Sequence, residues 1–206
     1  MILDTGAADF IGSNFVHKWL RCTGEPMISL DALTYAGSLK NLKDLMDDLR
    51  HAFVRGDIED RELVAQLLSR HQPRDVINLA AESHVDRCIH RPDTQTDIVR
   101  TCSLLEAVRA YWESLDDTQK LNFRFLHVST DEVCDSLTAE SPPFTETHRY
   151  GPKSPYSASG ETTCCGYARH VVVWATLQAR TLKLHPESIE AINTAEYPVE
   201  NANELQ

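Results

Sequence analysis

The chain has 206 residues and a formal net charge of −11, with 42% hydrophobic and 25% charged residues. This length fits one ordinary domain, or one domain with a fragment of another. The acidic balance argues against nucleic acid and anionic membrane as partners, since both carry negative charge. It does not exclude a phosphorylated small molecule, because backbone amides can hold a phosphate locally.

The apolar and cysteine patterns exclude further classes. No stretch approaches the roughly 18 uninterrupted apolar residues of a membrane span. The first residues read directly as a strand, with no basic region and no long apolar run of a signal peptide. The six cysteines form no C-x-x-C pair and no zinc-like spacing. We therefore predict a cytoplasmic protein without a metal site, because scattered thiols fit a reducing compartment.

Short apolar runs alternate with segments of helical periodicity, which is the pattern of βαβ units and a parallel sheet. The predicted strands are Ile2–Leu3, Met27–Leu30, Phe53–Val54, Val76–Ala81 and Phe123–Val128. The predicted helices are Phe10–Leu20, a stripe over Leu39–Leu49, a stripe over Leu63–Leu68, and a long helix from about Pro92 to Trp112. The pattern predicts an α/β fold, a Rossmann-like doubly wound parallel sheet.

The character of the sequence changes from about Cys164 onward. Val171–Trp174 fits a helix or a strand, because its period does not decide between them. Residues 191–206 are polar without periodicity, which favours a frayed or disordered end. We therefore divide the chain into a Rossmann-like domain, residues 1–170, and a divergent tail, residues 171–206, that is partly helical or disordered.

A glycine turn follows the first strand. Gly6 and Gly12 have the spacing of the first and third glycines of a dinucleotide-binding turn, which bend the chain and allow close packing of helix on strand. Asp9 stands at the middle position, where the backbone must come closest to the phosphates. Repulsion between its charge and a phosphate charge about 4 Å away is on the order of 1–4 kcal/mol. We expect Asp9 to weaken dinucleotide binding.

Two further acids complete the predicted nucleotide site. Asp31 ends the second strand, about 20 residues on, where a carboxylate can accept from both ribose hydroxyls and favours NAD over NADP. Asp57 and Ile58 follow the third strand. The alternative is a Rossmann-shaped fold without a cofactor, because of Asp9. Asp4 is a second anomaly, since a charge in a buried strand is costly unless it is neutralised or paired.

Longer motifs resemble one enzyme family. They are Asp31–Gly37 (DALTYAG), Leu79–Arg87 (LAAESHVDR), Ser129–Val133 (STDEV), Phe144–Glu146 (FTE) and Ser154–Ser159 (SPYSAS). The chain resembles the dTDP-glucose 4,6-dehydratases, in the extended branch of the short-chain dehydrogenase/reductase superfamily. The resemblance runs from Ile2 to about Ser159. Its most specific parts are Ala81–Arg87 and the Thr-Asp-Glu triplet at 130–132.

The resemblance implies NAD-dependent dehydration of dTDP-glucose to dTDP-4-keto-6-deoxyglucose, which supplies deoxysugars for surface lipopolysaccharide. It implies that Tyr156 takes the proton of the sugar 4-hydroxyl, with Thr130 hydrogen-bonded to the same hydroxyl. Glu132 would remove the C5 proton, and protonated Asp131 would help the 6-hydroxyl leave as water. Adjacent carboxylates suit this division, because proximity pushes their pKa values apart.

The resemblance also implies binding residues and a partner. With the two glycines of the turn, the residues expected at the NAD site are Gly6, Phe10, Ile11, Gly12, Asp31, Ala32, Leu33, Thr34, Asp57, Ile58, Leu79, Ala80, Ala81, Glu82, Ser83, Thr96 and Tyr156. Ser83 and Thr130 would contact the nucleotide-sugar substrate. The family pairs through helices that start near Pro92 and Tyr156, so a homo- or hetero-dimer is expected.

The chain also departs from the family pattern. Gly160 stands where the family has the lysine that lowers the tyrosine pKa, and near pKa 10 only about one Tyr156 in a thousand is ionised at neutral pH. Asp97 and Arg100 replace an asparagine and a glycine. The match ends near Tyr167, before the family's substrate-binding half. We therefore expect a truncated and degenerate dehydratase that lacks the C-terminal substrate domain, with absent or severely reduced turnover. The alternatives are a non-catalytic module that binds nucleotide or hetero-dimerises, and a decayed gene product without function.

Overall fold

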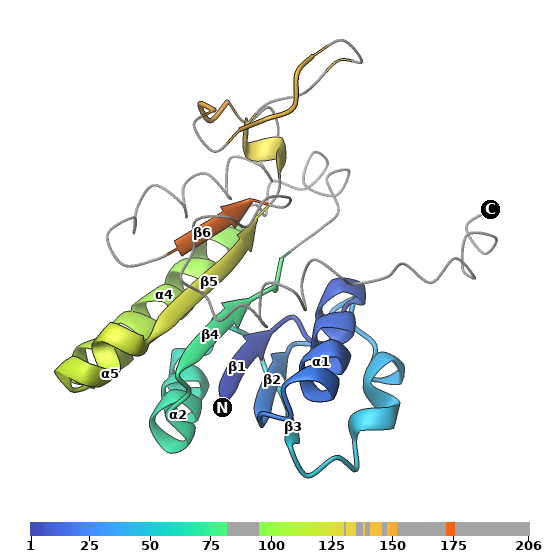
Figure 1. The fold of residues 1–206 in the computed structure, drawn as a ribbon, viewed down its shortest axis with the longest axis vertical. Helices are drawn as coiled ribbons and strands as arrows, with labels where there is room; N and C mark the ends of the chain where they lie inside the picture. Colours follow the sequence, from blue (N-terminus) through green and yellow to red (C-terminus); the bar gives the residue numbers. More distant parts are fainter. Residues whose placement is uncertain are drawn as a thin grey trace.

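The computed structural model of the chain describes residues 1–81, 95–129, 131–134, 138, 141–145, 148–151 and 172–175. For residues 95–98, 131–132 and 172–175 it describes the backbone alone. Over these ranges six parallel strands form one sheet in the order β3-β2-β1-β4-β5-β6 (Figure 1). This is the strand order of a doubly wound Rossmann-like fold, as the alternating pattern predicts.

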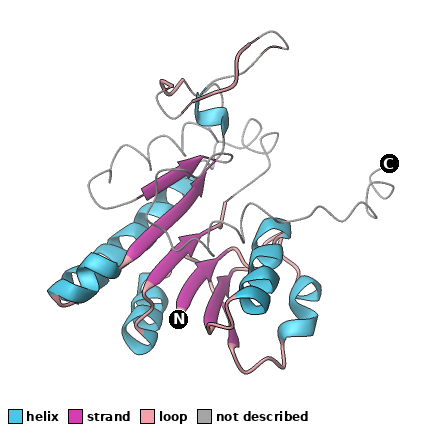
Figure 2. Cartoon of the chain, viewed as in Figure 1, coloured by secondary structure: helices cyan, strands magenta, loops and turns pink. Residues whose placement is uncertain are grey.

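Figure 2 shows the strands and the helices that connect them. The strands are β1 (Ile2–Thr5), β2 (Met27–Asp31), β3 (His51–Arg55), β4 (Asp75–Asn78), β5 (Arg124–Ser129) and β6 (Val172–Ala175). The helices are α1 (Phe10–Cys22), α2 (Arg61–His71), α4 (Gln95–Ser114) and α5 (Asp117–Asn122), with short 3-10 helices η1 (Leu39–Leu45) and η2 (Asp131–Cys134). No helix in the described ranges is both long and apolar enough to span a bilayer.

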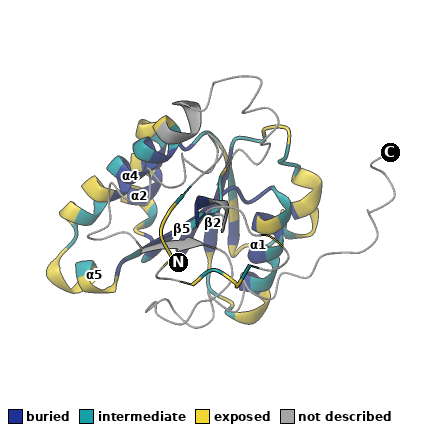
Figure 3. Cartoon of the chain, turned by 90° about the horizontal axis from the view of Figure 1, so that it is seen from above, coloured by how far each residue is buried: buried dark blue, intermediate teal, exposed yellow. Residues whose placement is uncertain are grey.

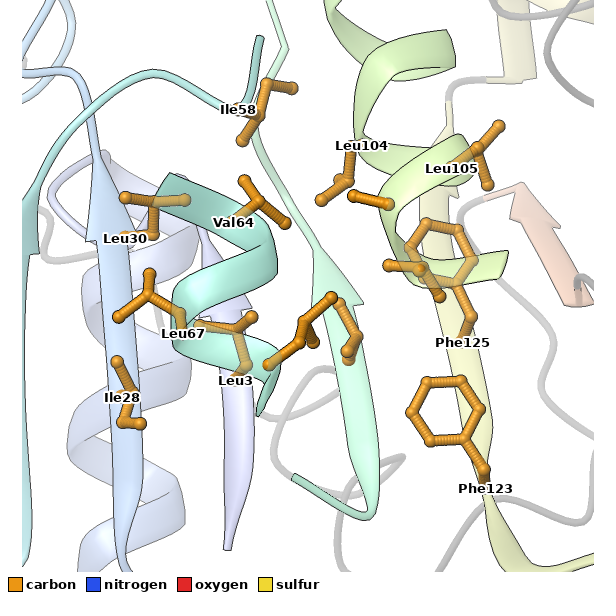
Figure 4. Packing of buried hydrophobic residues seen from close by; sticks show 14 residues of the cluster. Leu3, Ile28, Leu30, Ile58, Val64, Leu67, Leu104, Leu105, Phe123 and Phe125 are labelled. Carbon is orange, nitrogen blue, oxygen red and sulfur yellow. The ribbon is translucent and has the colours of Figure 1, made fainter. Parts of the chain in front are cut away.

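The sheet is covered on both faces, as a parallel sheet requires. Seen from above, α1 lies on one side of the sheet and α2, α4 and α5 lie on the other (Figure 3). Successive residues of a strand point to opposite faces. On β1, Ile2 packs into the cluster of the α1 face with Phe15 and Trp19. Leu3 packs into the cluster of the opposite face, which Figure 4 shows between the sheet, α2 and α4.

The position of β1 decides where a ligand can bind. β1 pairs with β2 on one side and with β4 on the other, so the strand order reverses direction at this point. In open parallel sheets, ligands bind beyond the carboxyl ends of the strands at such a switch point. The residues that follow β1, β2, β3, β4 and β5 therefore form the candidate site.

The segment after β2 does not form the predicted helix. The stripe over Leu39–Leu49 predicts a helical face, but the chain forms η1, which ends at Leu45. Only Leu42 is buried, and Leu49 is fully exposed. A 3-10 helix has three residues per turn, so residues 39, 42 and 45 already share one side, and long runs are uncommon.

The other elements differ from prediction mainly in extent. β4 ends at Asn78, three residues before the predicted end of the strand. Helix α5 was not predicted, although Asp116 and Gln119 form a capping box at its start. The undecided segment near residue 172 forms β6, which pairs with β5 and extends the sheet past residue 170. The division between domain and tail stays a prediction, since residues 176–206 lie outside the described ranges.

Candidate nucleotide-binding and active site

The glycine turn after β1 is tightly packed. Gly6 has φ +79°, and a Cβ there would lie 2.6 Å from the backbone N of Ala80, beyond β4. A Cβ at Gly12 would lie 2.0 Å from the carbonyl O of Gly6. A left-handed φ favours glycine, and both contacts exclude a side chain. The two glycines therefore bring the start of α1 close against the end of β1, as the spacing predicts.

Asp9 is the residue that precedes α1. Its φ of −75° and ψ of 173° are ordinary extended values, so this position does not require glycine for backbone reasons. Its carbonyl O accepts from Ser13 N at 2.9 Å, and its side chain makes no capping hydrogen bond with the first turn of α1. The amino end of a helix attracts anions, including phosphates. Asp9 thus places its own negative charge at the end of the helix where a pyrophosphate would bind.

Asp31 holds the turn together from the end of β2. Its Oδ2 accepts from Ala8 N at 2.8 Å and its Oδ1 accepts from Leu33 N at 2.7 Å. A Cβ at Gly37 would lie 3.0 Å from Asp31 Oδ1, so the loop passes directly over the carboxylate. A carboxylate offers about four lone-pair positions. Asp31 can therefore orient the turn and still accept from ribose hydroxyls.

The loop after β2 supports the turn in a way that the sequence did not predict. The carbonyl O of Ala8 accepts from Ser38 N at 3.0 Å and from Asn41 Nδ2 at 2.8 Å. Leu33, in the same loop, has φ +53°, an uncommon value for a non-glycine residue. The glycine at position 37, which follows the second strand, was the available signal for this close approach.

Asp57 continues the site beyond β3. Gly56 N donates to Asp31 O at 3.0 Å, which joins the two strand ends. Asp57 Oδ1 accepts from Glu59 N at 3.0 Å, and Asp57 Oδ2 lies 3.1 Å from Arg100 Nη2 of α4. The sequence predicts Asp57 as a cofactor-site residue, whereas Arg100 stands out only as a departure from the family pattern. Their ion pair was therefore not predicted.

The remaining predicted cofactor residues lie around the same edge. Ile58 is buried, Leu79 and Ala80 are half-buried just past β4, and Ala81 is exposed. In the first turn of α1, Phe10 is half-buried and Ile11 is exposed. After β2, Ala32 is half-buried and Thr34 is exposed. Thr96 lies in the first turn of α4, where only the backbone is described. Glu82 and Ser83 lie outside the described residues.

The acid pair follows β5. Asp131 and Glu132 begin η2, two residues after the strand ends at Ser129, and their side chains are not described. Val133 is buried beside them, and its carbonyl O accepts from Gly151 N at 2.9 Å. The backbone therefore places both acids at the carboxyl edge of the sheet, where the nucleotide turn also lies. Thr130, Tyr156 and Gly160 lie outside the described residues.

The charge in the first strand is buried and neutralised. Asp4 is fully buried, Ser29 Oγ donates to its Oδ1 at 2.7 Å, and burial raises the pKa of Asp4 to about 8. At neutral pH the native chain therefore holds Asp4 mainly as the neutral acid. Neutralisation is one of the two ways in which the sequence allows a carboxyl group at this position.

A dinucleotide fits this edge in part. The glycine turn packs the start of α1 close to the end of β1, and Asp31 ends β2, where the sequence predicts the ribose contact. Asp9, at the start of α1, would add a negative charge beside a pyrophosphate bound there.

Comparisons with known proteins agree with this geometry. Residues 3–175 match the family model described as GDP-mannose 4,6 dehydratase. A dTDP-glucose 4,6-dehydratase of Xanthomonas campestris pv. campestris (strain B100) is 55% identical over 159 residues, which are 76% of this chain and 45% of the relative. The dTDP-glucose 4,6-dehydratase 1 of Escherichia coli (strain K12) is 48% identical over 168 residues, 77% of this chain and 46% of the relative.

A solved structure shows the same fold. The crystal structure of dTDP-glucose 4,6-dehydratase from Bacillus anthracis in complex with NAD has a TM-score of 0.68 and 36% sequence identity. It covers 84% of this chain, and the match covers 53% of that protein. The chain thus spans about half the length of the relatives that it matches. Since the family model covers most of its residues, the chain belongs to the GDP-mannose 4,6-dehydratase family.

Proposed function

We propose that the chain is a nucleotide-binding domain of the dTDP-glucose 4,6-dehydratase type, with NAD as its cofactor and a dTDP-linked glucose as the ligand of its family. The observation that carries the proposal is the shared carboxyl edge. The glycine turn after β1, Asp31 after β2 and the acid pair after β5 all lie at this edge. The similarity to dTDP-glucose 4,6-dehydratases supports the choice of sugar nucleotide.

In this proposal the catalytic residues have the roles that the family resemblance implies. NAD, when bound, supplies the site that takes up and returns a hydride. Tyr156 takes the proton of the sugar 4-hydroxyl, and Thr130 hydrogen-bonds the same oxygen. Glu132 removes the proton at C5, and Asp131 gives a proton to the leaving 6-hydroxyl. Two neighbouring carboxyl groups of unequal pKa can act as base and acid.

We propose that turnover by this chain is absent or far below that of a working dehydratase. Gly160 removes the cation that would lower the pKa of Tyr156, and Asp9 opposes the pyrophosphate. Positioned acid–base groups contribute about 10²–10⁴-fold to a rate. The match also covers less than half of these two relatives. Any substrate contacts made by the other half of the relatives have no counterpart among the matched residues.

Titration with NAD tests the binding proposal. Asp9→Gly should tighten binding by roughly 5- to 1000-fold, because it removes a charge whose repulsion of a phosphate is about 1–4 kcal/mol. Asp116→Gly is the matched control, since Asp116 also precedes a helix but lies at the start of α5. It should weaken the cap and leave NAD affinity unchanged. Equal affinity of Asp9→Gly and wild type would refute the assigned phosphate position.

A product assay tests the catalytic proposal. The wild type and Gly160→Lys should both give little 4-keto-6-deoxy product, read by its alkaline absorbance, because groups that act as a unit are not restored one at a time. The double variant with Asp9→Gly is compared in the same assay. Strong activity of Gly160→Lys alone would show that the unmatched part of the relatives is not needed.

The alternative function is a non-catalytic module that pairs with a second chain. Val99 on α4 is 47% exposed, and α4 is the helix through which pairing is expected. We propose a homo- or hetero-dimer through this face. Cys22, Cys102 and Cys134 form no disulfide in the described part of the chain, and we propose a reducing compartment such as the cytoplasm. Sedimentation of wild type and Val99→Asp decides the pairing, since an unchanged monomer in both would remove this candidate.

A further inference from the structure

Arg100 lies at one end of the proposed nucleotide site. The sheet order places β2 outside β1 and β3 outside β2. A dinucleotide with its pyrophosphate at α1 and its ribose at Asp31 therefore extends its purine base toward the loop after β3. Asp57 and Ile58 are in that loop, and Arg100 reaches it from α4. Ile58 is buried in the apolar cluster beneath the loop, so the floor of the loop is apolar.

Two polar side chains meet at the loop after β3, and this corner, Asp57 with Arg100, combines opposite hydrogen-bonding character. Asp57 only accepts hydrogen bonds, and its Oδ1 is already bonded to Glu59 N. Arg100 only donates. Its Nη2 lies 3.1 Å from Asp57 Oδ2, while its Nε is 3.9 Å from Glu59 Oε2 and has no hydrogen-bond partner in the described part of the chain. The loop after β3 thus holds a carboxylate and a guanidinium that are each only partly used, and the unpartnered Nε of Arg100 is buried.

We propose that Arg100 determines which purine this site accepts, by allowing a 6-oxo group where Asp57 alone would select a 6-amino group. The inference rests on the proposed nucleotide function. A 6-amino group donates and must share Asp57 Oδ2 with the guanidinium. A 6-oxo group accepts and can bond to the partly exposed guanidinium of Arg100. A site that leaves a buried polar group unpaired rejects a ligand strongly, whereas Arg100 gives both ligands a partner.

A second ion pair between the same elements provides the control. Arg61, at the start of α2, pairs with Glu106 of α4 at 2.5 Å, and its Nε lies 3.4 Å from Ser103 Oγ. Arg61 therefore bridges the β3–α2 region to α4, as Arg100 does, but further along α4. If Arg100 served only to fasten the loop to the helix, the loss of Arg61 would have a similar effect on ligand preference.

The experiment is a calorimetric titration with NAD and with nicotinamide hypoxanthine dinucleotide, in which a 6-oxo group replaces the 6-amino group. The wild type and Arg61→Ala should bind the two within a few-fold. Arg100→Met, which keeps the length of the side chain, should raise the preference for NAD by about tenfold, equivalent to about 1.4 kcal/mol. Should Arg100→Met fail to fold, Asp57→Asn tests the corner from the other side and should shift preference toward the hypoxanthine compound.

The outcomes separate two failures. An Arg100→Met protein that binds both dinucleotides in the wild-type ratio overturns the inference and leaves the proposed function standing. A change in ratio shared equally by Arg61→Ala also overturns it. If neither compound binds the wild type or any variant, including Asp9→Gly, the proposed nucleotide function fails and the inference fails with it.

Discussion

The two faces of the central sheet each bury a row of polar side chains, and the rows differ in what happens when the pH changes. On the α1 face the row consists of Asp4, Ser29 and His51. Ser29 Oγ donates to Asp4 Oδ1 at 2.7 Å, and His51 Nε2 lies 2.9 Å from Ser29 Oγ. Asp4 Oδ2 has no hydrogen-bond partner among the described residues. This row contains an acid that burial holds in its neutral form.

On the α2 and α4 face the row consists of Thr5, Asn78 and His127. Thr5 Oγ1 donates to Asn78 Oδ1 at 2.5 Å, and Asn78 Nδ2 lies 2.8 Å from His127 Nδ1. The amide nitrogen can only donate, so His127 Nδ1 accepts and the ring is neutral. Burial lowers the pKa of His127 to about 4. The bond between Asn78 and His127 therefore depends on an imidazole that stays unprotonated.

The buried acid and the buried base are both neutral in the native chain, but for opposite reasons: Asp4 keeps a proton and His127 does not take one. Below pH 6.5 the unfolded chain protonates His127 and the native chain does not, so stability from this row is lost as pH falls from 6.5 toward 4. Above pH 3.8 the native chain keeps the proton on Asp4 that the unfolded chain loses, so stability is lost as pH rises from 3.8 toward 8. Between about pH 4 and 6.5 the two trends oppose each other.

Asp4→Val should have the largest effect. It removes the buried acid whose neutral form becomes progressively harder to maintain as pH rises, at roughly 1.4 kcal/mol per pH unit between its unfolded and folded pKa. The variant should exceed the wild type in free energy of unfolding at pH 8 by about 3–5 kcal/mol, and by less at pH 5. Urea unfolding at the two pH values measures this.

The control for this prediction is Asp75→Val in β4. Asp75 is also buried, but its Oδ2 pairs with Arg74 Nη1 at 2.5 Å. Its loss should lower stability, because it breaks a partly buried ion pair, even though Arg74 keeps its bonds to Glu25. If Asp4→Val destabilised the protein as Asp75→Val does, the account of Asp4 as an unfavourable buried acid would be wrong.

A smaller effect on the free energy of unfolding should come from the titration of His127, which can be measured once Asp4 is removed. In Asp4→Val the opposing trend is gone, so the free energy of unfolding should fall by about 2–3 kcal/mol as pH drops from 7 to 5. His51 adds to this fall, since burial lowers its pKa too. Adding His127→Asn should remove most of the dependence on pH. A double variant that keeps the full slope would mean that His127 is not the titrating group.

The sequence predicted those features that depend on local periodicity and on short motifs. Alternation of apolar runs predicted the sheet, and the glycine spacing predicted a turn in which Gly12 has no space for a Cβ. The second bond of Asp31, to Ala8 N, was not predicted because it depends on how the loop after β2 folds back. The same loop misled the helix prediction, since apolar spacing does not distinguish η1 from an α-helix over so few residues.

Contacts between distant segments were the least predictable. Arg100 could be recognised as a departure from the family, but its pairing with Asp57 requires α4 and the β3–α2 loop to lie side by side. Asp4 and His127 are similar, because each partner lies on a neighbouring strand and the pKa follows from burial. The roles of Tyr156 and of the acid pair stay predictions, since their side chains lie outside the described part of the chain.

Thr5→Val should have the smallest effect on the free energy of unfolding. It keeps the shape of the side chain but removes the hydroxyl that donates to Asn78 Oδ1, which leaves a buried acceptor unpaired. Such a loss costs about 1–3 kcal/mol. Neither Thr5 nor Asn78 titrates, so the loss should be the same at pH 6.5 and pH 8, whereas the effect of Asp4→Val grows over that interval. Urea unfolding of both variants in parallel measures the difference, and a Thr5→Val effect that changes with pH across this interval would show that the two rows are coupled through the sheet.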